Sequence, residues 1–181
     1  MTEPIERITA NGVVTADGRE REVDTIVFAT GFAATKSLSA LDVTGRDGVH
    51  IDEAWSEGAM AYLGMTTAGF PNLFMLYGPN TNQGSLITMI EWQVEHVLKH
   101  IVRMRDEGLA SVEVRADSMA EYNDYIQSEI EAIDTWQASC GNYYRAPSGR
   151  IVTQWPHSMG RYRDAVEEID TGAYATEARG D

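Results

Sequence analysis

The sequence has a single cysteine, Cys140, and few basic residues. Against 28 aspartates and glutamates stand 14 lysines and arginines, which gives the 181 residues a formal net charge of −14. One cysteine excludes a disulfide within the chain and a cage of thiolates around a metal. The negative charge opposes binding to nucleic-acid phosphates and docking on an anionic membrane leaflet. These absences favour an acidic protein of a reducing cytosol, with neither nucleic acid nor membrane as partner.

Long hydrophobic runs and nucleotide-binding fingerprints are missing as well. The first residues are acidic and lack an apolar stretch, so they do not resemble a signal peptide. No window reaches the length of a membrane span, and no strand is followed by Gly-x-Gly-x-x-Gly. The apolar share of 43% is nevertheless enough for a packed core. We expect one folded domain or parts of two, beginning in the middle of a larger fold.

The stretch from Gly69 to Gly108 reads as strand, polar loop and helix in one run. Residues 72–77 are apolar between two turn signals, which predicts a buried strand. The loop at 78–84 contains Pro79 and two glycines and does not continue a strand. From Ser85 to Glu107 apolar residues recur at helical spacing: Leu86, Ile90, Val94, Val97, Ile101 and Met104. A helix N-terminus reached in this way presents free backbone N–H groups to anionic or carbonyl oxygens.

The other elements follow from shorter patterns. Asn-Gly and Asp-Gly turns predict a three-stranded meander over residues 5–30, with its third strand at 22–30. Residues 41–43, 61–67, 111–115 and 149–153 are further predicted strands, and 51–55 is a helical turn. Gly108 is expected to end the long helix, and Asp117 to cap a second long helix. A charged helical stretch is expected at 158–169.

Three weaker signals have two readings each. Ala29-Thr30-Gly31 at a strand end allows close approach of a backbone or a flat ligand, or merely ends the strand. His96 and His100 stand four apart, as a metal pair does, but no third ligand has suitable spacing and a partly exposed helix face is favoured. Cys140 has no histidine near it in sequence, which favours a buried thiol over a nucleophile.

Three separated pieces resemble the flavin-dependent monooxygenases of the Baeyer–Villiger and flavin-containing type. Residues 24–32 (Asp-Thr-Ile-Val-Phe-Ala-Thr-Gly-Phe) look like the second Ala-Thr-Gly element of that family. Residues 62–64 and 69–81, the latter ending Leu-Tyr-Gly-Pro-Asn-Thr, are similar to its C-terminal strand and loop. Residues 136–144, Trp155-Pro156 and Tyr162-Arg163 resemble the tail of Baeyer–Villiger members. The order and spacing agree across nearly the whole chain.

The resemblance implies an α/β fold. The chain would be the C-terminal portion of a Rossmann-like flavoprotein with two dinucleotide-binding domains, carrying an N-terminal β-meander and two long helices. Residues 1–28 would end the NAD(P)H-binding domain, and 29–181 would form the C-terminal half of the FAD-binding domain with an aromatic tail. The family's FAD and NADPH fingerprints and its active-site arginine lie upstream of this part, so we assign no catalytic residue and no metal ligand here.

The resemblance also implies a function. In this family NADPH reduces FAD, the flavin captures O₂, and one oxygen atom is inserted into a ketone or a heteroatom substrate, while the protein supplies position and electrostatics. The implied partners are that small organic substrate, O₂ and the missing N-terminal FAD/NADPH half. Without that half we expect weak FAD binding and no NADPH oxidation. The alternatives are a truncated, non-catalytic product and a small flavin-binding or regulatory module.

The implied cofactor-binding residues lie in three places. Polar residues 80–83 suit the pyrimidine edge and ribityl chain of the flavin, or they only close a surface loop. Tyr143 takes the place of a tryptophan that is associated with the nicotinamide cofactor, or it packs in the core. The full set is Ala29, Thr30, Gly31, Phe32, Gly78, Pro79, Asn80, Thr81, Asn82, Gln83, Ser85, Leu86 and Tyr143.

Overall fold

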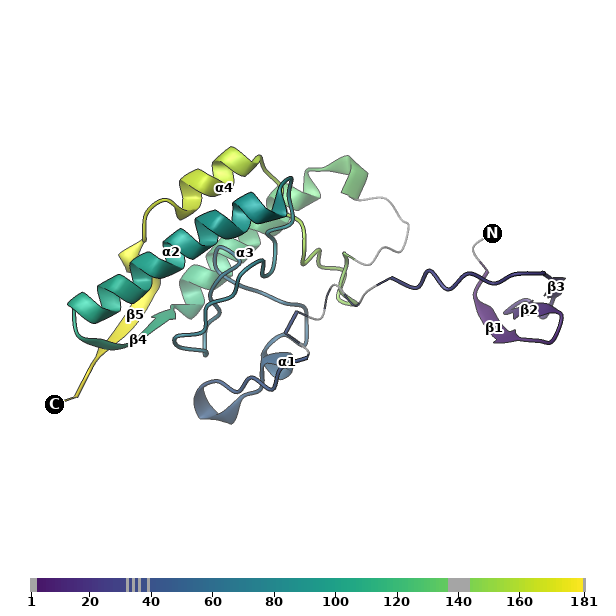
Figure 1. The fold of residues 1–181 in the computed structure, drawn as a ribbon, viewed down its shortest axis with the longest axis horizontal. Helices are drawn as coiled ribbons and strands as arrows, with labels where there is room; N and C mark the ends of the chain where they lie inside the picture. The colour runs from purple at the N-terminus through teal and green to yellow at the C-terminus, as the bar shows by residue number, and fades with distance from the viewer. Residues whose placement is uncertain are drawn as a thin grey trace. The chain divides into compact units, whose positions relative to one another are not determined.

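The computed structural model describes residues 3–31, 33, 35, 37–38, 40–136 and 144–180 (Figure 1). The chain folds as two compact units, Met1–Phe32 and Ala33–Asp181. Among the described residues no helix has the length and apolar character needed to cross a membrane. The helices and one two-stranded sheet belong to the second unit, and a three-stranded sheet forms the first.

The first unit is the predicted β-meander. Strands β1 (Ile5–Ile8), β2 (Gly12–Thr15) and β3 (Glu20–Glu22) pair antiparallel in that order. A Cβ on Gly12 would lie 1.9 Å from the carbonyl oxygen of Arg21, so only glycine fits where β2 meets β3. The turn after β2 uses a positive φ of 77° at Gly18, which glycine adopts without strain.

The third strand differs from its prediction. We expected it at residues 22–30, but β3 ends at Glu22, and residues 23–31 form no strand. Val27 and Phe28 are 80% and 74% exposed. A strand needs a neighbour for its ladder of hydrogen bonds, and no described strand of this unit pairs with residues 24–30. The apolar run therefore has no packing partner within the first unit.

The second unit is built on helices, and the two long helices are confirmed. Helix α2 spans Leu86–Asp106 and α3 spans Ala116–Glu131, with the shorter α4 at Met159–Val166 and α1 at Ile51–Ala54. Strand β4 (Leu109–Val114) covers the predicted strand and pairs antiparallel with β5 (Tyr174–Ala178). The sequence did not predict β5, since only its first residue is buried. Single-turn 3-10 helices occur at Arg46–Gly48, Asp134–Trp136 and Thr171–Ala173.

Four predicted short strands are wrong. Residues 41–43, 61–67, 72–77 and 149–153 make isolated bridges or single backbone hydrogen bonds instead of ladders. Leu63, Asn72 and Tyr77 have positive φ values of 52°, 60° and 56°, which break extended structure. The Met75 amide donates to the Met65 carbonyl at 2.8 Å, one such single contact. Apolar runs here fill a core by folding back on themselves rather than by joining a sheet.

The helix ends follow local chemistry. Ser85 caps α2, its Oγ accepting from the Thr88 amide at 3.4 Å. Gly108, with φ 64°, follows the last residues of α2 as predicted. The expected cap of α3 is wrong: the N-cap is Arg115, and Asp117 lies inside the first turn. There its carboxylate accepts from the Ser118 amide at 2.8 Å and faces the positive end of the helix dipole.

The largest core cluster lies between α2, α3 and α4. Tyr162 of α4 is fully buried at its centre, donating its hydroxyl to the Leu63 carbonyl at 2.8 Å and accepting from Gln93 Nε2 at 2.7 Å. Burial raises the pKa of Tyr162 well above its usual value. Figure 1 shows α4 running alongside α2. The buried members are Leu63, Met65, Met89, Ile126, Ile130, Ile151, Trp155, Tyr162 and Val166.

Helix α2 turns a partly polar face inward. Its buried residues are Met89, Gln93, His96 and His100, whereas Val94 and Ile101 of the predicted apolar stripe are 37% and 50% exposed. The stripe prediction was therefore wrong for these two residues, while Val97 and Met104 of the stripe do pack against core clusters. Two of the inner polar residues find partners: Gln93 Oε1 accepts from the Tyr77 amide at 2.8 Å, and His96 Nδ1 lies 2.7 Å from the Val166 carbonyl.

The two histidines are buried, which corrects the expectation of an exposed helix face. His96 is 1% exposed and His100 is fully buried, with ring centroids 5.0 Å apart. His100 packs against Tyr174 and Phe74, and neither of its ring nitrogens has a hydrogen-bond partner. Burial, with the neighbouring His96 and Arg103, lowers the pKa of His100 to about 4. Both rings are therefore neutral at physiological pH.

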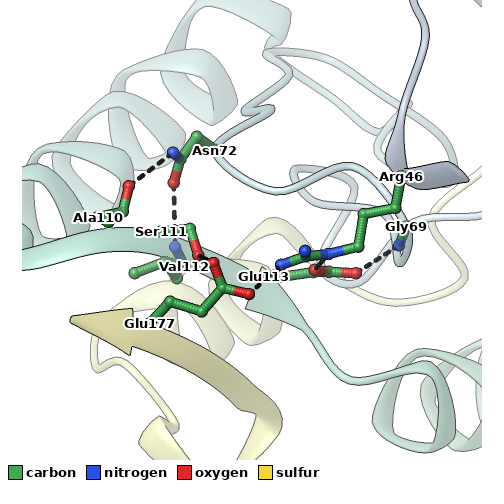
Figure 2. Close-up of polar contacts among 8 residues, drawn as sticks. All are labelled: Arg46, Gly69, Asn72, Ala110, Ser111, Val112, Glu113 and Glu177. Carbon is green, nitrogen blue, oxygen red and sulfur yellow. Dashed lines mark hydrogen bonds and ion pairs between the residues drawn. The ribbon is translucent and has the colours of Figure 1, made fainter. Parts of the chain in front are cut away.

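A charged network joins Arg46 and Gly69 to the paired strands β4 and β5 (Figure 2). Arg46 bridges Glu113 at 2.5 Å and Glu177 at 2.7 Å, and the other oxygen of Glu113 accepts from the Gly69 amide at 2.7 Å. The side chain of Asn72 bonds to two residues of β4. Its Nδ2 donates to the Ala110 carbonyl at 3.1 Å, and its Oδ1 accepts from the Val112 amide at 3.0 Å. These contacts fix the start of the stretch that leads to the loop at 78–84.

Stability should depend on pH through the buried His100. In the unfolded chain the His100 ring binds a proton below about pH 6.5, whereas in the native protein its pKa is about 4. The free energy of unfolding should therefore hold above pH 6.5 and fall by up to about 3 kcal/mol as pH drops to about 4. Urea unfolding at several pH values measures this.

The variant His100→Leu has a side chain of similar size that does not titrate, so its pH slope should be smaller. As a control, His50→Asn at the N-cap of α1 keeps a capping acceptor at the surface and should keep the full slope. An unchanged slope in His100→Leu would contradict the assignment.

Candidate functional site

The polar loop at 78–85 is locked to the turn at residues 62–66 by close contact between backbones. A Cβ on Gly78 would lie 2.3 Å from the Gly64 carbonyl oxygen, and one on Gly64 would lie 2.1 Å from Thr81 Cγ2. Gly64 also has a φ of 68°. Both positions therefore need glycine, one for space and the other for space and conformation. The loop conformation is fixed before any ligand contact is considered.

Asn80 is the main polar anchor of the loop. It is 2% exposed and has a φ of 56°, which asparagine tolerates better than most residues. Its amide donates to the Val152 carbonyl, and its Nδ2 donates to the carbonyls of Ile151 and Gln154, each at 2.9 Å. Its Oδ1 is buried without a partner. Thr81, fully buried, donates its hydroxyl back to the Gly78 carbonyl at 2.7 Å.

Asn82 and Gln83 continue this attachment along residues 151–159, which we call the tail segment. The Asn82 amide donates to the Thr153 carbonyl at 2.8 Å, and its Nδ2 donates to Gln154 Oε1 at 2.8 Å. Gln83 Nε2 donates to the His157 carbonyl at 3.2 Å. Sequence patterns did not identify the tail segment as the partner of this loop. The pairing joins residues about 70 positions apart, and local spacing carries no sign of it.

The end of the loop is the accessible part. Residues 84–87 are exposed, whereas Pro79, Asn80 and Thr81 are buried. The amides of Leu86 and Ile87 open the 21-residue helix α2 and have no carbonyl one turn earlier to bind. The Ser85 amide donates to Met159 Sδ at 3.3 Å. The positive end of the helix dipole thus meets solvent and is suited to an anionic or carbonyl oxygen.

The charged side chains nearest the tail segment form one small cluster. Arg161 NH1 lies 3.1 Å from His157 Nδ1, and arginine has only donors. Nδ1 of His157 therefore accepts, and the ring proton sits on Nε2, 2.8 Å from the Tyr125 hydroxyl. Burial and the charge of Arg161 lower the pKa of His157. These contacts orient the His157 ring, whose Nε2 also lies 3.6 Å from Glu129 Oε2.

The predicted cofactor residues are distributed unevenly over the structure. It brings residues 78–86 together as one loop and helix start. Ala29, Thr30 and Gly31 belong to the first unit and are exposed there. Phe32 and Tyr143 lie outside the described residues, as does Cys140. Within the described residues, no three or more histidine, cysteine, aspartate or glutamate side chains are grouped to hold a metal.

The geometry fits one edge of a flavin. Exposed amides at the start of α2 suit a ring edge that carries carbonyl oxygens and, when reduced, negative charge. The buried Pro79, Asn80 and Thr81 shape the backbone that delivers those amides. Contact of any of these residues with a flavin stays a prediction.

Comparison with known proteins gives consistent matches. No protein-family model matches the chain. The chain is 44% identical over 177 residues to a Baeyer–Villiger monooxygenase of Pseudomonas aeruginosa, covering 96% of this chain and 34% of that protein. It is 38% identical over 175 residues to an FAD-binding monooxygenase of Aspergillus niger, covering 93% and 28%. The chain therefore spans about a third of the length of these curated relatives.

Solved structures of related enzymes match the fold of the chain. Cyclohexanone monooxygenase from Rhodococcus sp. Phi1 bound to NADP⁺ has a TM-score of 0.80 at 29% identity, covering 98% of this chain and 34% of that chain. A steroid monooxygenase bound to NADP has a TM-score of 0.76 at 29% identity, with the same coverage. The resemblance to flavin-dependent monooxygenases that was inferred from three sequence segments is confirmed, and so is the α/β fold class.

Replacing Asn80 should loosen the loop measurably. Asn80→Ala removes two side-chain hydrogen bonds and forces alanine into a positive φ, for a loss of about 3 kcal/mol in the free energy of unfolding. Asn80→Gly removes the same bonds without the backbone strain and should lose about 1 kcal/mol less. Urea unfolding compares them with Gln83→Ala, which should lose less than about 1 kcal/mol. Equal losses in all three variants would show that Asn80 is not the anchor.

Proposed function

The chain is homologous to flavin-dependent Baeyer–Villiger monooxygenases over about a third of their length, and from this we propose that it forms part of such an enzyme. The reaction is the NADPH- and FAD-dependent insertion of one oxygen atom of O₂ into a ketone. The alternative substrate class is a compound oxygenated at a heteroatom. The observation that carries the proposal is the 44% identity to the Pseudomonas aeruginosa relative across 96% of this chain. A reducing cytosol is the compartment we propose, on the evidence of one cysteine.

The role of this chain is to position the flavin. Bound FAD, reduced by NADPH, supplies the oxygen chemistry. The amides of Leu86 and Ile87 would hold a carbonyl edge of the ring, and the dipole of α2 would favour negative charge there by about 0.3–1 kcal/mol. Asn80, Thr81 and Gly78 hold the loop that aims those amides. Within residues 78–87, the proposal thus separates residues that would contact the flavin from residues that shape the loop.

The remaining FAD- and NADPH-binding part is the partner we propose, whether it is supplied by the same polypeptide or by another. The outward face of α2 supports this because it exposes several large apolar side chains beside Glu91 and Glu95: Ile87, Val94, Leu98 and Ile101 are 65%, 37%, 52% and 50% exposed. Large apolar side chains gathered on one exposed helix face favour an interface. The relatives carry about two thirds of their length outside the match, which is enough for such a partner.

A chimera tests the function. This chain replaces the matched third of the Pseudomonas aeruginosa relative, and NADPH oxidation and product formation are measured with cyclohexanone. We expect a yellow, FAD-containing protein whose NADPH oxidation rises on addition of the ketone, with a lactone as product. Gly78→Val should disturb the loop by about 1–3 kcal/mol, since its side chain meets the Gly64 carbonyl, and should lower flavin occupancy. A folded chimera that binds FAD and NADPH yet oxygenates neither ketone nor sulfide would refute the proposed reaction.

Mixing the separate parts tests the partner. Leu98→Glu places a charge on the outward face of α2 and should weaken association with the N-terminal two thirds of the same relative by about tenfold or more. Because Leu98 is half exposed, its own unfolding free energy should change by less than about 0.5 kcal/mol. Thr176→Glu adds the same charge on the exposed strand β5 and serves as the control. Light scattering and titration calorimetry measure the association of each variant, and urea unfolding measures its stability. Equal association of the two variants would contradict the assigned face.

A further inference from the structure

Met159 places its sulfur against the accessible end of the loop. The residue opens α4 and is half-buried, whereas Gly84 and Ser85 are exposed. The Ser85 amide donates to its Sδ at 3.3 Å. A Cβ on Gly84 would lie 2.4 Å from the same sulfur, so loop backbone and thioether are in direct contact. The Ser85 amide at the start of α2 is thus bonded to the tail segment through one oxidisable atom.

Access separates Met159 from several other methionines. Met65, Met75 and Met89 are buried in the core, at 0%, 5% and 0% exposure. Met119 on α3 is half-buried, and its sulfur also accepts a backbone amide, from Ala68 at 3.4 Å. Its contacts are with residues 67–68 rather than with the loop at 78–85. Met119 therefore provides a matched comparison: the same bond type at a different place.

We propose that Met159 is an oxidation site, and that its conversion to the sulfoxide releases the start of α2 from the tail segment. Hydrogen peroxide is the oxidant. The sulfur attacks one peroxide oxygen, the O–O bond breaks and an S–O bond forms. The proton of the transferred oxygen passes to the departing hydroxide, which leaves as water. Sulfur loses two electrons and peroxide gains two, and methionine sulfoxide reductases reverse the change.

Oxidation of Met159 would change its packing against Gly84 and Ser85. The thioether is apolar and lies close to Gly84, where a Cβ would be 2.4 Å from Sδ. The sulfoxide adds a polar oxygen to that sulfur, which is incompatible with the contact as it stands. The Ser85 amide then loses the thioether sulfur as its acceptor, and the Met159 side chain and residues 84–85 move apart. Since the proposed flavin contacts follow directly at Leu86 and Ile87, oxidation would couple peroxide to cofactor binding. Only this last consequence rests on the proposed function.

The test uses the chain itself and no flavin. Peroxide-treated protein is mapped by peptide mass spectrometry, and amide hydrogen exchange is followed in a peptide over residues 80–90. Met159 should oxidise before Met65 and Met89, and the Ser85 amide should then exchange about fivefold faster, as expected for one lost hydrogen bond. Enzymatic reduction of the sulfoxide should restore the original rate.

Two variants sharpen the result. Met159→Leu keeps the size of the side chain and should show no exchange response to peroxide, while Met119→Leu should respond as the unmodified protein does. The proposal is overturned if Met159 resists peroxide as long as the buried methionines do. It is equally overturned if full oxidation leaves exchange of the Ser85 amide unchanged, or if Met159→Leu still responds. None of these outcomes depends on whether the chimera oxygenates a ketone.

Discussion

The close approach of two backbone segments at Gly64 and Gly78 is the constraint on which the rest of the second unit depends. With no side chain between them, the turn at 62–66 sits on the polar loop. That places Asn80 within reach of three carbonyl oxygens of the tail segment. The tail segment in turn leads into α4, which packs along α2 through Tyr162 and Gln93. One steric fact thus connects the loop, the tail and two helices.

This arrangement explains why the buried face of α2 is so polar. Gln93 serves the backbone of Tyr77 on one side and the hydroxyl of Tyr162 on the other. His96 serves the last turn of α4 through the Val166 carbonyl. Irregular segments carry backbone groups that need partners, and a helix packed against such segments has to supply them. Met89, Val97 and Met104 of α2 pack inward, whereas Ile87, Val94, Leu98 and Ile101 are left exposed, available to a larger assembly.

The long helices, their approximate ends and the meander could be predicted because each depends on local rules. Spacing of apolar residues, the serine at position 85 and the glycine at position 108 act within a few residues. The short strands could not be predicted, since a strand exists only with a partner. Residues 72–77 have the composition of a strand, yet positive φ at Asn72 and Tyr77 turns them into irregular backbone. In the opposite case, β5 shows little pattern and forms because β4 is beside it.

The candidate site divides along the same line. The sequence by itself determined that a polar, glycine-containing loop opens a long helix and that the chain resembles a flavin-dependent family, because both follow from the order of residues. Only the tertiary structure decided that Asn80 and Thr81 are buried anchors, that the start of α2 is exposed, and that Met159 touches it. These outcomes depend on contacts between residues about 70 positions apart. Such contacts arise from packing of the whole unit, and no local pattern encodes them.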